Sequence, residues 1–367
     1  MNLDELRQAL TELDGQLIDL VARRQSLSEQ VAAAKRATGR PTRDFARERE
    51  VILRGRSAAE RLHVSPDLAE SLLRQLIQSS LTTQEQARVA AQAQGSGKRA
   101  LVIGGRGKMG GWFADFLASQ GFHVAIADPA GRLPQFDYVA DWKKDALDQD
   151  LIVLATPLGA TADLLAALAK RAPPGLIFDL GSLKTPLRAG LKALVEAGCK
   201  VTSLHPMFGP DTELLSGRHV IFIDLGNREA LDEAQALFAP TMAERVVMGL
   251  DEHDRLIAYV LGLSHALNIA FFTALAESGE AAPRLARLSS TTFDAQLDVA
   301  SRVAEESPEL YFEIQSLNEY GGESLRALSQ AVERLVGAVE SKNAAEFTAM
   351  MNRGRAYLDV RAASRPG

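Results

Sequence analysis

The feature that most constrains the fold is a glycine loop that directly follows a short apolar run. The run Ala100–Ile103 leads to Gly105, Gly107 and Gly110, spaced as G-x-G-x-x-G, and a helix-like stretch follows. Between a strand and a helix, such glycines allow a tight turn and a close approach of the backbone to a pyrophosphate. The start of the helix also favours an anion. We therefore expect an α/β, doubly wound (Rossmann) domain that binds a dinucleotide.

The next apolar run, Val124–Ala127, ends in an acidic residue, Asp128. A carboxylate at this place accepts hydrogen bonds from the ribose hydroxyls of NAD and repels the extra phosphate of NADP. NAD is therefore the expected cofactor, although a glycine turn without a ligand remains an alternative. The predicted cofactor-binding residues are Gly105, Gly107, Met109, Gly110, Asp128, Thr156 and Pro157.

Hydrophobic patterning divides the chain into three segments. Residues 1–93 are expected to be all helical, 99–250 alternate apolar runs with helical stretches, and 251–367 are helical again. The alternation predicts a parallel sheet with helices on both faces. The fold class is thus multidomain, with an all-α N-terminal domain, a Rossmann domain and an all-α C-terminal domain that serves dimerisation.

The first segment begins with a leucine heptad that runs from Leu3 to Leu20 and resumes at Leu27. It predicts one long helix whose apolar stripe needs a partner chain. Arg24 occupies a heptad position that should be apolar, and Lys35 lies on the same helical face. A snorkelling arginine would be the structural explanation for Arg24. Two later helices are expected, one around 47–56 and one that starts after Ser65.

Composition excludes several classes of protein. The net charge of −6 argues against nucleic acid as a partner. The single cysteine, Cys199, forms no internal disulfide, and no Cys/His cluster has the spacing of a metal site. The start of the chain lacks the pattern of a signal peptide, so we expect a cytoplasmic protein. The uncharged stretch Leu256–Ala276 is interpreted as a helix buried on all sides in a subunit interface, not as a membrane span.

Polar groups follow several apolar runs, where ligands of open α/β sheets bind. Ser182 follows one run, and His205 lies in a segment bounded by glycine and proline that we interpret as a rigid loop. A histidine alone can be structural, but beside a serine and a nicotinamide site His205 is a candidate general base.

Four sequence strings resemble the prephenate dehydrogenase family: Gly105–Gly110, Asp179–Lys184, Leu204–Pro210 and Glu252–Asp254. The resemblance covers about residues 99–360. It implies that His205 takes the proton of the substrate's ring hydroxyl, that Ser182 lies near this hydroxyl, and that Arg302 binds a carboxylate. Lys184 and His265 also match substrate-site positions of the family, whereas Glu252–Asp254 is expected to have a structural role at a helix start.

The first segment resembles the all-helical chorismate mutases. The resemblance implies that Arg7, from the partner chain, and Arg24 bind carboxylates, and that Lys35 and Gln84 are catalytic groups at the ether oxygen. Asp44 and Glu48 are implied to hold the side of the ring that carries the hydroxyl. The full set of matching positions is Arg7, Arg24, Lys35, Asp44, Arg47, Glu48, Ser80 and Gln84.

Together these resemblances imply a bifunctional chorismate mutase/prephenate dehydrogenase of the T-protein type, which acts in tyrosine biosynthesis. Its expected partners are chorismate, prephenate and a second copy of the chain; whether tyrosine acts as an effector stays open. Three alternatives also stay open. They are a hydroxyacid dehydrogenase with a non-catalytic helical arm, a sensor without catalysis, and a dehydrogenase that prefers arogenate.

Overall fold

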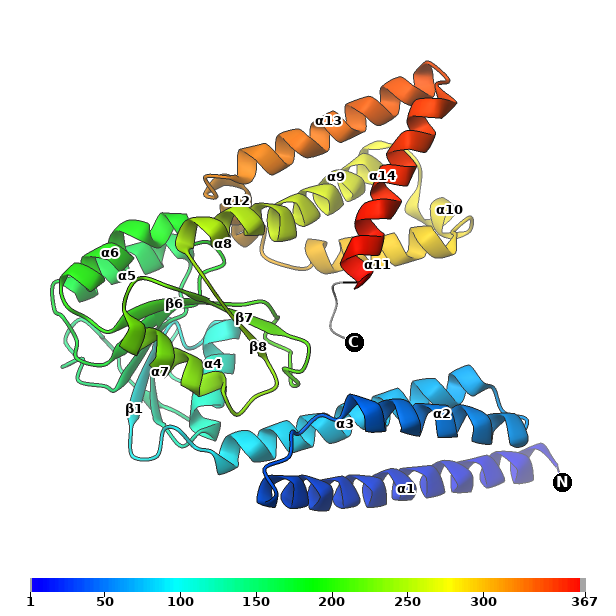
Figure 1. The fold of residues 1–367 in the computed structure, drawn as a ribbon, viewed down its shortest axis with the longest axis horizontal. Coiled ribbons are helices and arrows are strands. Elements are labelled where there is room, and N and C mark those ends of the chain that lie inside the picture. Colours follow the sequence, from blue (N-terminus) through cyan, green and yellow to red (C-terminus); the bar gives the residue numbers. More distant parts are fainter. Residues whose placement is uncertain (1, 364–367) are drawn as a thin grey trace.

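The computed structural model describes residues 2–363. Its N-terminal part consists of three helices, which Figure 1 shows lying beside one another at some distance from the C-terminal helices. Asn2 caps the first helix in a capping box with Glu5, and Ser65 caps the third, as predicted. The second helix is longer than expected. The three helices are α1 (Leu3–Ala37), α2 (Phe45–Arg61) and α3 (Pro66–Ala91).

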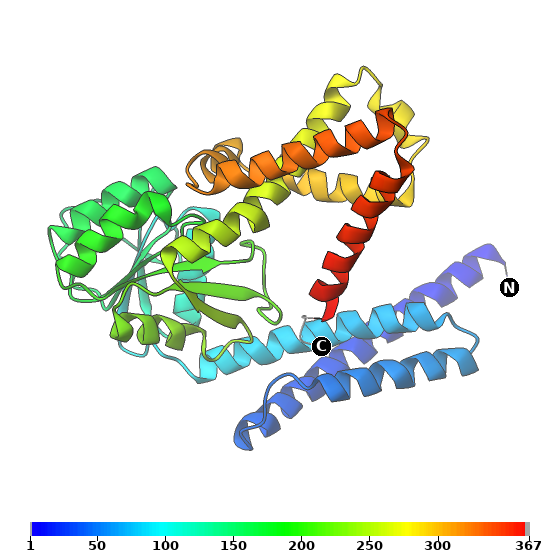
Figure 2. The ribbon, with the colours of Figure 1, turned by 45° about the horizontal axis from the view of Figure 1, so that its top comes forward.

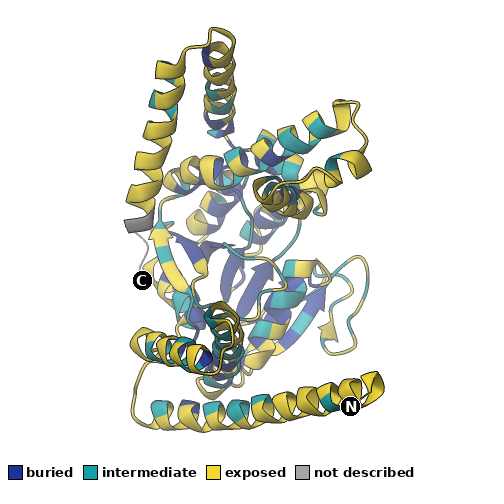
Figure 3. Cartoon of the chain, turned by 90° about the vertical axis from the view of Figure 1, so that its right-hand side faces the viewer, coloured by how far each residue is buried: buried dark blue, intermediate teal, exposed yellow. Residues whose placement is uncertain are grey.

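Helix α1 exposes its leucine stripe in the single chain. Leu10 and Leu17 are 62% and 59% exposed, and among the residues of α1 only Ala32 is buried. Figure 3 shows this helix exposed over most of its length. An apolar stripe of this length is costly in water, and a partner chain that covers it remains our prediction.

The central part contains an eight-stranded sheet with the order β3-β2-β1-β4-β5-β6-β7-β8. The strand pairs are parallel except β6–β7, which is antiparallel, so the prediction of a wholly parallel sheet is wrong at this pair. The segment that carries His205 was expected to be a loop but forms strand β6. The strands are β1 (Arg99–Ile103), β2 (His123–Ala127), β3 (Asp137–Tyr138), β4 (Leu151–Leu154), β5 (Leu176–Asp179), β6 (Val201–Pro206), β7 (His219–Ile223) and β8 (Glu244–Met248).

Helices cover both faces of the sheet, as a doubly wound fold requires. Phe113 of α4 and Phe238 of α7 pack with Phe178 and Phe222 on one face. Aliphatic side chains of α5 and α6 pack on the other face. The helices of this part are α4 (Lys108–Ser119), α5 (Leu158–Ala169), the short 3-10 helix η1 (Thr185–Leu187), α6 (Arg188–Glu196) and α7 (Arg228–Phe238).

The C-terminal part is wholly helical and extends from the sheet on the same side as the N-terminal helices (Figures 1 and 2). Its first three elements form one continuous rod, Leu250–Glu277. The elements are α8 (Leu250–Ile257), the π-helix η2 (Ala258–Leu263), α9 (Ser264–Glu277), α10 (Ala282–Ala286), α11 (Thr291–Ala304), α12 (Pro308–Ser316), α13 (Gly321–Glu340) and α14 (Ala344–Ala363).

The rod Leu250–Glu277 is long and apolar enough to cross a membrane, judged by length and composition alone. Only 22% of an apolar 18-residue stretch of this rod is buried in the single chain. The prediction of a helix buried on all sides is therefore wrong for the chain by itself. Within the rod, Asn268 donates to the Ser264 carbonyl and accepts from Gln296 of α11. This polar link fits a helix packed against protein, and a subunit interface remains our prediction for its exposed face.

Candidate active sites

The glycine loop joins β1 to α4 with a geometry that side chains would block. Gly104 has a φ of +89°, and a Cβ on Gly110 would lie 2.1 Å from the Gly104 carbonyl oxygen. At the end of β2, the Asp128 carboxylate accepts hydrogen bonds from the backbone N–H groups of Arg106 at 3.0 Å and Ala130 at 2.8 Å. The carboxylate is thus held beside the loop. Loop and carboxylate together fit the pyrophosphate and ribose of a dinucleotide.

The other predicted cofactor residues lie around the same loop. Thr156 follows β4, and its hydroxyl is hydrogen-bonded to that of Thr161 in α5. Pro157 is the residue before α5 and leaves this helix start without a side-chain cap. Met109 is half-buried and packs against the aromatic core. The start of α5 therefore lies beside the start of α4, since β1 and β4 are adjacent parallel strands.

His205, on β6, belongs to a buried relay with two residues of α8. Its Nδ1 lies 2.9 Å from His253 Nε2, and His253 Nδ1 lies 2.6 Å from Asp254 Oδ1. A carboxylate only accepts, so His253 Nδ1–H donates to Asp254, and His253 Nε2 accepts from His205 Nδ1–H. This leaves His205 Nε2 without a proton. The relay therefore selects the tautomer in which Nε2 is able to act as a base.

Burial sets the charge of this relay. It holds the pKa of His205 well below the usual 6.5, and His253 and Lys184 lower that pKa further. Burial also lowers the pKa of His253, against the opposing effect of its hydrogen bond to Asp254. Burial alone would raise the pKa of Asp254, but hydrogen bonds from His253 and Thr185 outweigh it, and the net pKa is lowered. The relay is accordingly a neutral imidazole pair on a carboxylate at pH 7.

Lys184 is fully buried and does not face an open site. Its ammonium donates to Asp179 Oδ1 at 2.9 Å and to the Leu204 carbonyl at 2.7 Å, while its backbone N–H donates to Asp254. Burial lowers the pKa of Lys184, against the opposing charge of Asp179. In the single chain, Lys184 ties β5 to β6 and helps to hold Asp254. Its substrate-binding role stays a prediction.

Three predicted residues stand apart from the relay. Ser182, after β5, is half-buried. His265 of α9 packs its ring on Tyr311 with centroids 4.3 Å apart, and its buried Nδ1 has no hydrogen-bond partner among the described residues. Arg302 of α11 is exposed. No hydrogen bond within residues 2–363 joins His205 to any of the three, and their place in one site stays a prediction.

His253 and Asp254 are the residues that sequence reasoning missed. They were expected to have only a structural role at the start of a helix, and they do begin the rod. Their contact with His205 spans 48 residues of sequence and depends on how α8 meets the sheet. The available signal was the presence of a histidine and carboxylates in Glu252–Asp254, since a carboxylate is the group that orients catalytic imidazoles.

In the N-terminal part, Arg24 bridges α1 and α3. Its guanidinium donates to the Leu76 carbonyl at 2.7 Å and to Ser80 Oγ at 2.6 Å, and burial lowers the pKa of Arg24. One turn further along α3, Gln84 Nε2 donates to Ser28 Oγ at 2.8 Å, while its buried Oε1 has no partner among the described residues. The heptad anomaly therefore marks a polar seam between two helices.

Lys35 and Gln84 line one hollow of about 420 Å³ near the C-terminal end of α1. Lys35 Nζ donates to the Thr42 carbonyl at 2.6 Å. Three further cations that were not predicted also line this hollow: Arg36, Arg40 and Arg88. The hollow therefore offers positive charge and an amide to a small anion.

The other predicted residues of this segment do not reach that hollow in the single chain. Asp44 caps α2 by accepting from the Arg47 N–H, and the Arg47 side chain pairs with Glu50. Glu48 forms a bidentate pair with Arg43. Arg7 is exposed near the N-terminal end of α1, with Asp4 at 3.5 Å. In the single chain the predicted constellation is thus split between this hollow, the α1–α3 seam, the start of α2 and the exposed end of α1.

Three family models match successive parts of the chain. Chorismate mutase type II matches residues 6–85, the nucleotide-binding domain of prephenate dehydrogenase matches 130–247, and its dimerization domain matches 250–353. The T-protein of Enterobacter agglomerans is 28% identical over 356 residues, which cover 96% of this chain and 91% of that protein.

The chain is a bifunctional chorismate mutase/prephenate dehydrogenase. The T-protein of Haemophilus influenzae is also 28% identical, over 85% of the chain and 80% of the relative. Among solved structures, a putative prephenate dehydrogenase of Corynebacterium glutamicum has a TM-score of 0.58 at 22% identity. The match covers 73% of this chain and 90% of that one.

Prephenate dehydrogenase of Aquifex aeolicus, in complex with hydroxyphenyl propionate and NAD+, has a TM-score of 0.55 at 17% identity, with 72% and 98% of the two chains covered. At identities this low, the two solved structures show only that the dehydrogenase part of the chain shares their fold. The family matches to both halves favour the bifunctional enzyme over a dehydrogenase with an inert arm.

Proposed function

We propose that each chain rearranges chorismate to prephenate in residues 1–93 and oxidises prephenate to 4-hydroxyphenylpyruvate in residues 99–367. In this division, 99–250 bind NAD and 251–367 supply the subunit interface and part of the substrate site. The observation that carries the dehydrogenase assignment is the relay of His205, His253 and Asp254, because it presents an unprotonated imidazole nitrogen at a strand end of an NAD-binding sheet.

In the dehydrogenase reaction, bound NAD supplies the hydride acceptor, held by the glycine loop and Asp128. His205 Nε2 takes the proton of the ring hydroxyl as its carbon is oxidised, and the charge that develops on the imidazole is stabilised through His253 by Asp254. The carboxylate on the ring leaves as carbon dioxide, and the electrons of the broken carbon–carbon bond make the ring aromatic. The phenolate oxygen so formed takes the proton back from His205, which restores the base. We assign Ser182 to the ring hydroxyl, and Arg302 and His265 to the remaining polar groups of prephenate.

In the mutase reaction, no group of the enzyme forms a bond to the substrate. Chorismate rearranges within itself, so the enzyme positions it and stabilises the charge that develops at the ether oxygen. We assign this stabilisation to Lys35 and the amide of Gln84. Arg24 is assigned to a carboxylate, which would replace its present contacts to Leu76 and Ser80.

The two activities can be tested in one assay that follows NADH formation. With NAD and prephenate, NADH should form at once. With NAD and chorismate alone, NADH should form after a lag, because prephenate has to accumulate first. NADH from prephenate but none from chorismate would leave the N-terminal helices as a non-catalytic arm. Faster NADH formation from arogenate than from prephenate would change the substrate assignment.

Dimers are proposed from the exposed leucine stripe of α1 and the apolar rod. Arg7 and Arg24 lie 17 residues apart on α1, roughly 100° around the helix, so both cannot serve one pocket of the same chain. Arg7→Ala and Arg24→Ala chains should each lose mutase activity. Mixed dimers should regain part of it, because one of their two pockets would have both arginines. Mutase assays on tagged, exchanged dimers measure the recovery.

The prephenate dehydrogenase activity of both variants is the control for folding. Proven heterodimers without any recovered mutase activity would mean that Arg7 acts within its own chain. We also place the enzyme in the cytoplasm, and propose tyrosine as an effector because it shares the ring and a carboxylate with the dehydrogenase product. Adding tyrosine to each assay tests that proposal.

A further inference from the structure

Helix α3 carries a row of polar side chains along the face that meets α1. Ser80, Gln84 and Arg88 follow one another at intervals of four residues, which places them on one side of the helix. Ser80 accepts from Arg24 of α1, and Gln84 donates to Ser28 of the same helix. The row therefore leads from two predicted mutase residues to Arg88, which was not predicted.

Arg88 lines the hollow of about 420 Å³ together with Lys35 and Gln84, the two groups assigned to the ether oxygen. Buried Thr42 contacts both cations. Its carbonyl accepts from Lys35 Nζ at 2.6 Å, and its hydroxyl accepts from Arg88 Nη1 at 3.3 Å. Ala32 of α1 contributes only a methyl group to the lining, which leaves room between the helices. Both charged groups are thus held at one hollow.

All charged side chains in the lining of this hollow are cations: Lys35, Arg36, Arg40 and Arg88. Arg36 and Arg40 are exposed, whereas Arg88 is half-buried. Among the described residues, Arg88 forms no ion pair, and its side chain donates only to Thr42. A half-buried guanidinium without a carboxylate partner, in a hollow lined by further cations, fits the carboxylate of a ligand.

The acidic residue nearest to Arg88 in the sequence is bound elsewhere. Glu85 is buried, and its carboxylate accepts from the backbone N–H of Leu215 at 2.7 Å and from that of Met242, both in the dehydrogenase half. Desolvation raises the pKa of Glu85, while these two hydrogen bonds and the charge of Arg88 oppose that shift. Because backbone donors occupy the Glu85 carboxylate, Arg88 remains available to a ligand.

The amide of Gln84 also leaves a polar atom for a ligand. Its Oε1 is buried and has no hydrogen-bond partner among the described residues, while its Nε2 donates to Ser28. A serine hydroxyl both donates and accepts, so half a turn of the amide would pair Oε1 with Ser28 and free Nε2. An ether oxygen has no hydrogen to donate, and this second orientation of the amide supplies the donor that it requires.

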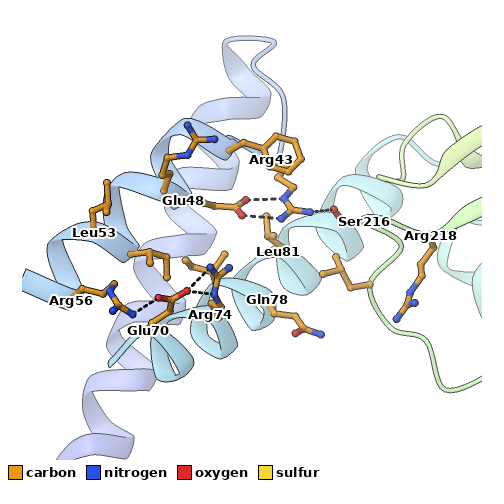
Figure 4. Close-up of a pocket in the computed structure, with 15 residues that line it drawn as sticks. Arg43, Glu48, Leu53, Arg56, Glu70, Arg74, Gln78, Leu81, Ser216 and Arg218 are labelled. Carbon is orange, nitrogen blue, oxygen red and sulfur yellow. Dashed lines mark hydrogen bonds and ion pairs between the residues drawn. The ribbon is translucent and has the colours of Figure 1, made fainter. Parts of the chain in front are cut away.

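A larger cavity of about 730 Å³ lies between α2, α3 and the segment before β7. Figure 4 shows that both of its carboxylates are occupied, Glu48 by Arg43 and Glu70 by Arg56 and Arg74. Neither of the residues assigned to the ether oxygen lines this cavity. We therefore place chorismate in the smaller hollow.

Chorismate carries one of its carboxylates on the enolpyruvyl group, where a single carbon separates it from the ether oxygen. A substrate whose ether oxygen is held by Lys35 and Gln84 therefore brings this carboxylate to the same hollow. We propose that Arg88 binds the enolpyruvyl carboxylate of chorismate. The inference rests on the proposed mutase function and adds a substrate-binding residue to it. A carboxylate accepts several hydrogen bonds, so Arg88 acts beside the arginines already assigned.

Arg88→Ala is the decisive variant in the full-length enzyme. Loss of a charge-assisted hydrogen bond to a carboxylate should raise the KM for chorismate by roughly 10- to 100-fold. The kcat should change by less than about threefold, because this carboxylate is held in the ground state and in the transition state alike. NADH formation from added prephenate should stay within about twofold of the parent. Arg88→Lys should have an intermediate KM, since it keeps the charge and loses the planar fork.

Two matched variants separate substrate binding from a structural role. Arg74→Ala removes an exposed arginine of the same helix that pairs with Glu70 and does not line the hollow, so its chorismate KM should equal that of the parent. Thr42→Val removes the hydroxyl that Arg88 contacts and keeps the carbonyl that Lys35 contacts. It should raise the KM by much less than Arg88→Ala does. If Thr42→Val reproduces the effect of Arg88→Ala, Arg88 only holds the chain at Thr42, and the inference is wrong.

The kinetic constants of Arg88→Ala distinguish the remaining outcomes. A rise in KM that exceeds any fall in kcat supports the inference. Constants equal to those of the parent, or a fall in kcat that exceeds the rise in KM, overturn it, while mutase activity of the parent keeps the proposed function. A parent without mutase activity overturns both. If Arg88→Ala loses both activities, Arg88→Lys decides: a raised chorismate KM with intact prephenate oxidation supports the inference, and a parental KM or the loss of both activities overturns it.

Discussion

Replacing His205 with Asn is expected to lower kcat for prephenate oxidation by about 10²- to 10⁴-fold, the usual effect of losing a general base. The asparagine amide keeps a hydrogen-bonding group beside His253 but does not accept the proton of the ring hydroxyl. The KM for prephenate should therefore change much less than kcat. Initial rates of NADH formation across a range of prephenate concentrations measure both constants.

The same protein carries its own control for folding. Chorismate consumption by the His205→Asn variant should match that of the parent, because no hydrogen bond within residues 2–363 joins His205 to the mutase helices. The pH dependence of kcat/KM is a second test of the role of His205. Burial places the pKa of His205 well below 6.5, so the parent should keep its kcat/KM as the pH falls through 6.5. Turnover of His205→Asn close to that of the parent would remove this histidine from the mechanism.

Asp254→Asn is the second variant for which we expect a large loss. An asparagine amide does not select the His253 tautomer as a carboxylate does, so His205 would no longer be held with Nε2 unprotonated. A buried carboxylate that orients a catalytic imidazole contributes up to about 10⁴-fold in kcat in serine proteases, and we expect a loss of about 10²- to 10⁴-fold here. Steady-state oxidation of prephenate at saturating NAD measures it.

Asp254 also accepts from the backbone of Lys184 and Thr185, so its replacement has a structural cost as well. Thr185→Val is the matched control, because it removes one hydroxyl from the same carboxylate and leaves His253 in place. It should lower thermal stability with little change in kcat. If Thr185→Val and Asp254→Asn lower kcat equally, Asp254 serves the fold and not the orientation of the imidazole.

Local patterns predicted the elements well where one stretch of sequence determines them. The glycine loop needs residues without a Cβ, because Gly110 lies so close to Gly104 that a side chain would not fit. The loop could therefore be predicted from the spacing of its glycines. The cap at Ser65 and the long helix α1 are likewise set by neighbours in sequence. Strand β6 was missed because glycine and proline after His205 indicated a loop, while its pairing with β5 and β7 is decided by residues far along the chain.

In the candidate sites, too, local features could be predicted from the sequence and contacts between distant residues could not. Types and spacings of residues predicted His205 and the mutase set, but sequence does not give burial. Lys184 matched a family position, yet the structure surrounds its ammonium with Asp179 and the Leu204 carbonyl. In the relay, His205 and His253 are 48 positions apart in the sequence. The hydrogen bond between Glu85 and Leu215 joins residues 130 positions apart. Such contacts follow from how whole elements pack, which periodicity does not encode.

The rod Leu250–Glu277 leads us to expect that the enzyme is sensitive to dilution. One end of this rigid body carries His253 and Asp254, and most of the remaining apolar surface lies open in the single chain. If a second subunit covers that surface, dissociation of the dimer would free the rod and loosen the support of the base at the same time. Specific activity in the oxidative step would then depend on protein concentration, and a chain that could not pair would be a poor catalyst even with every reacting group present.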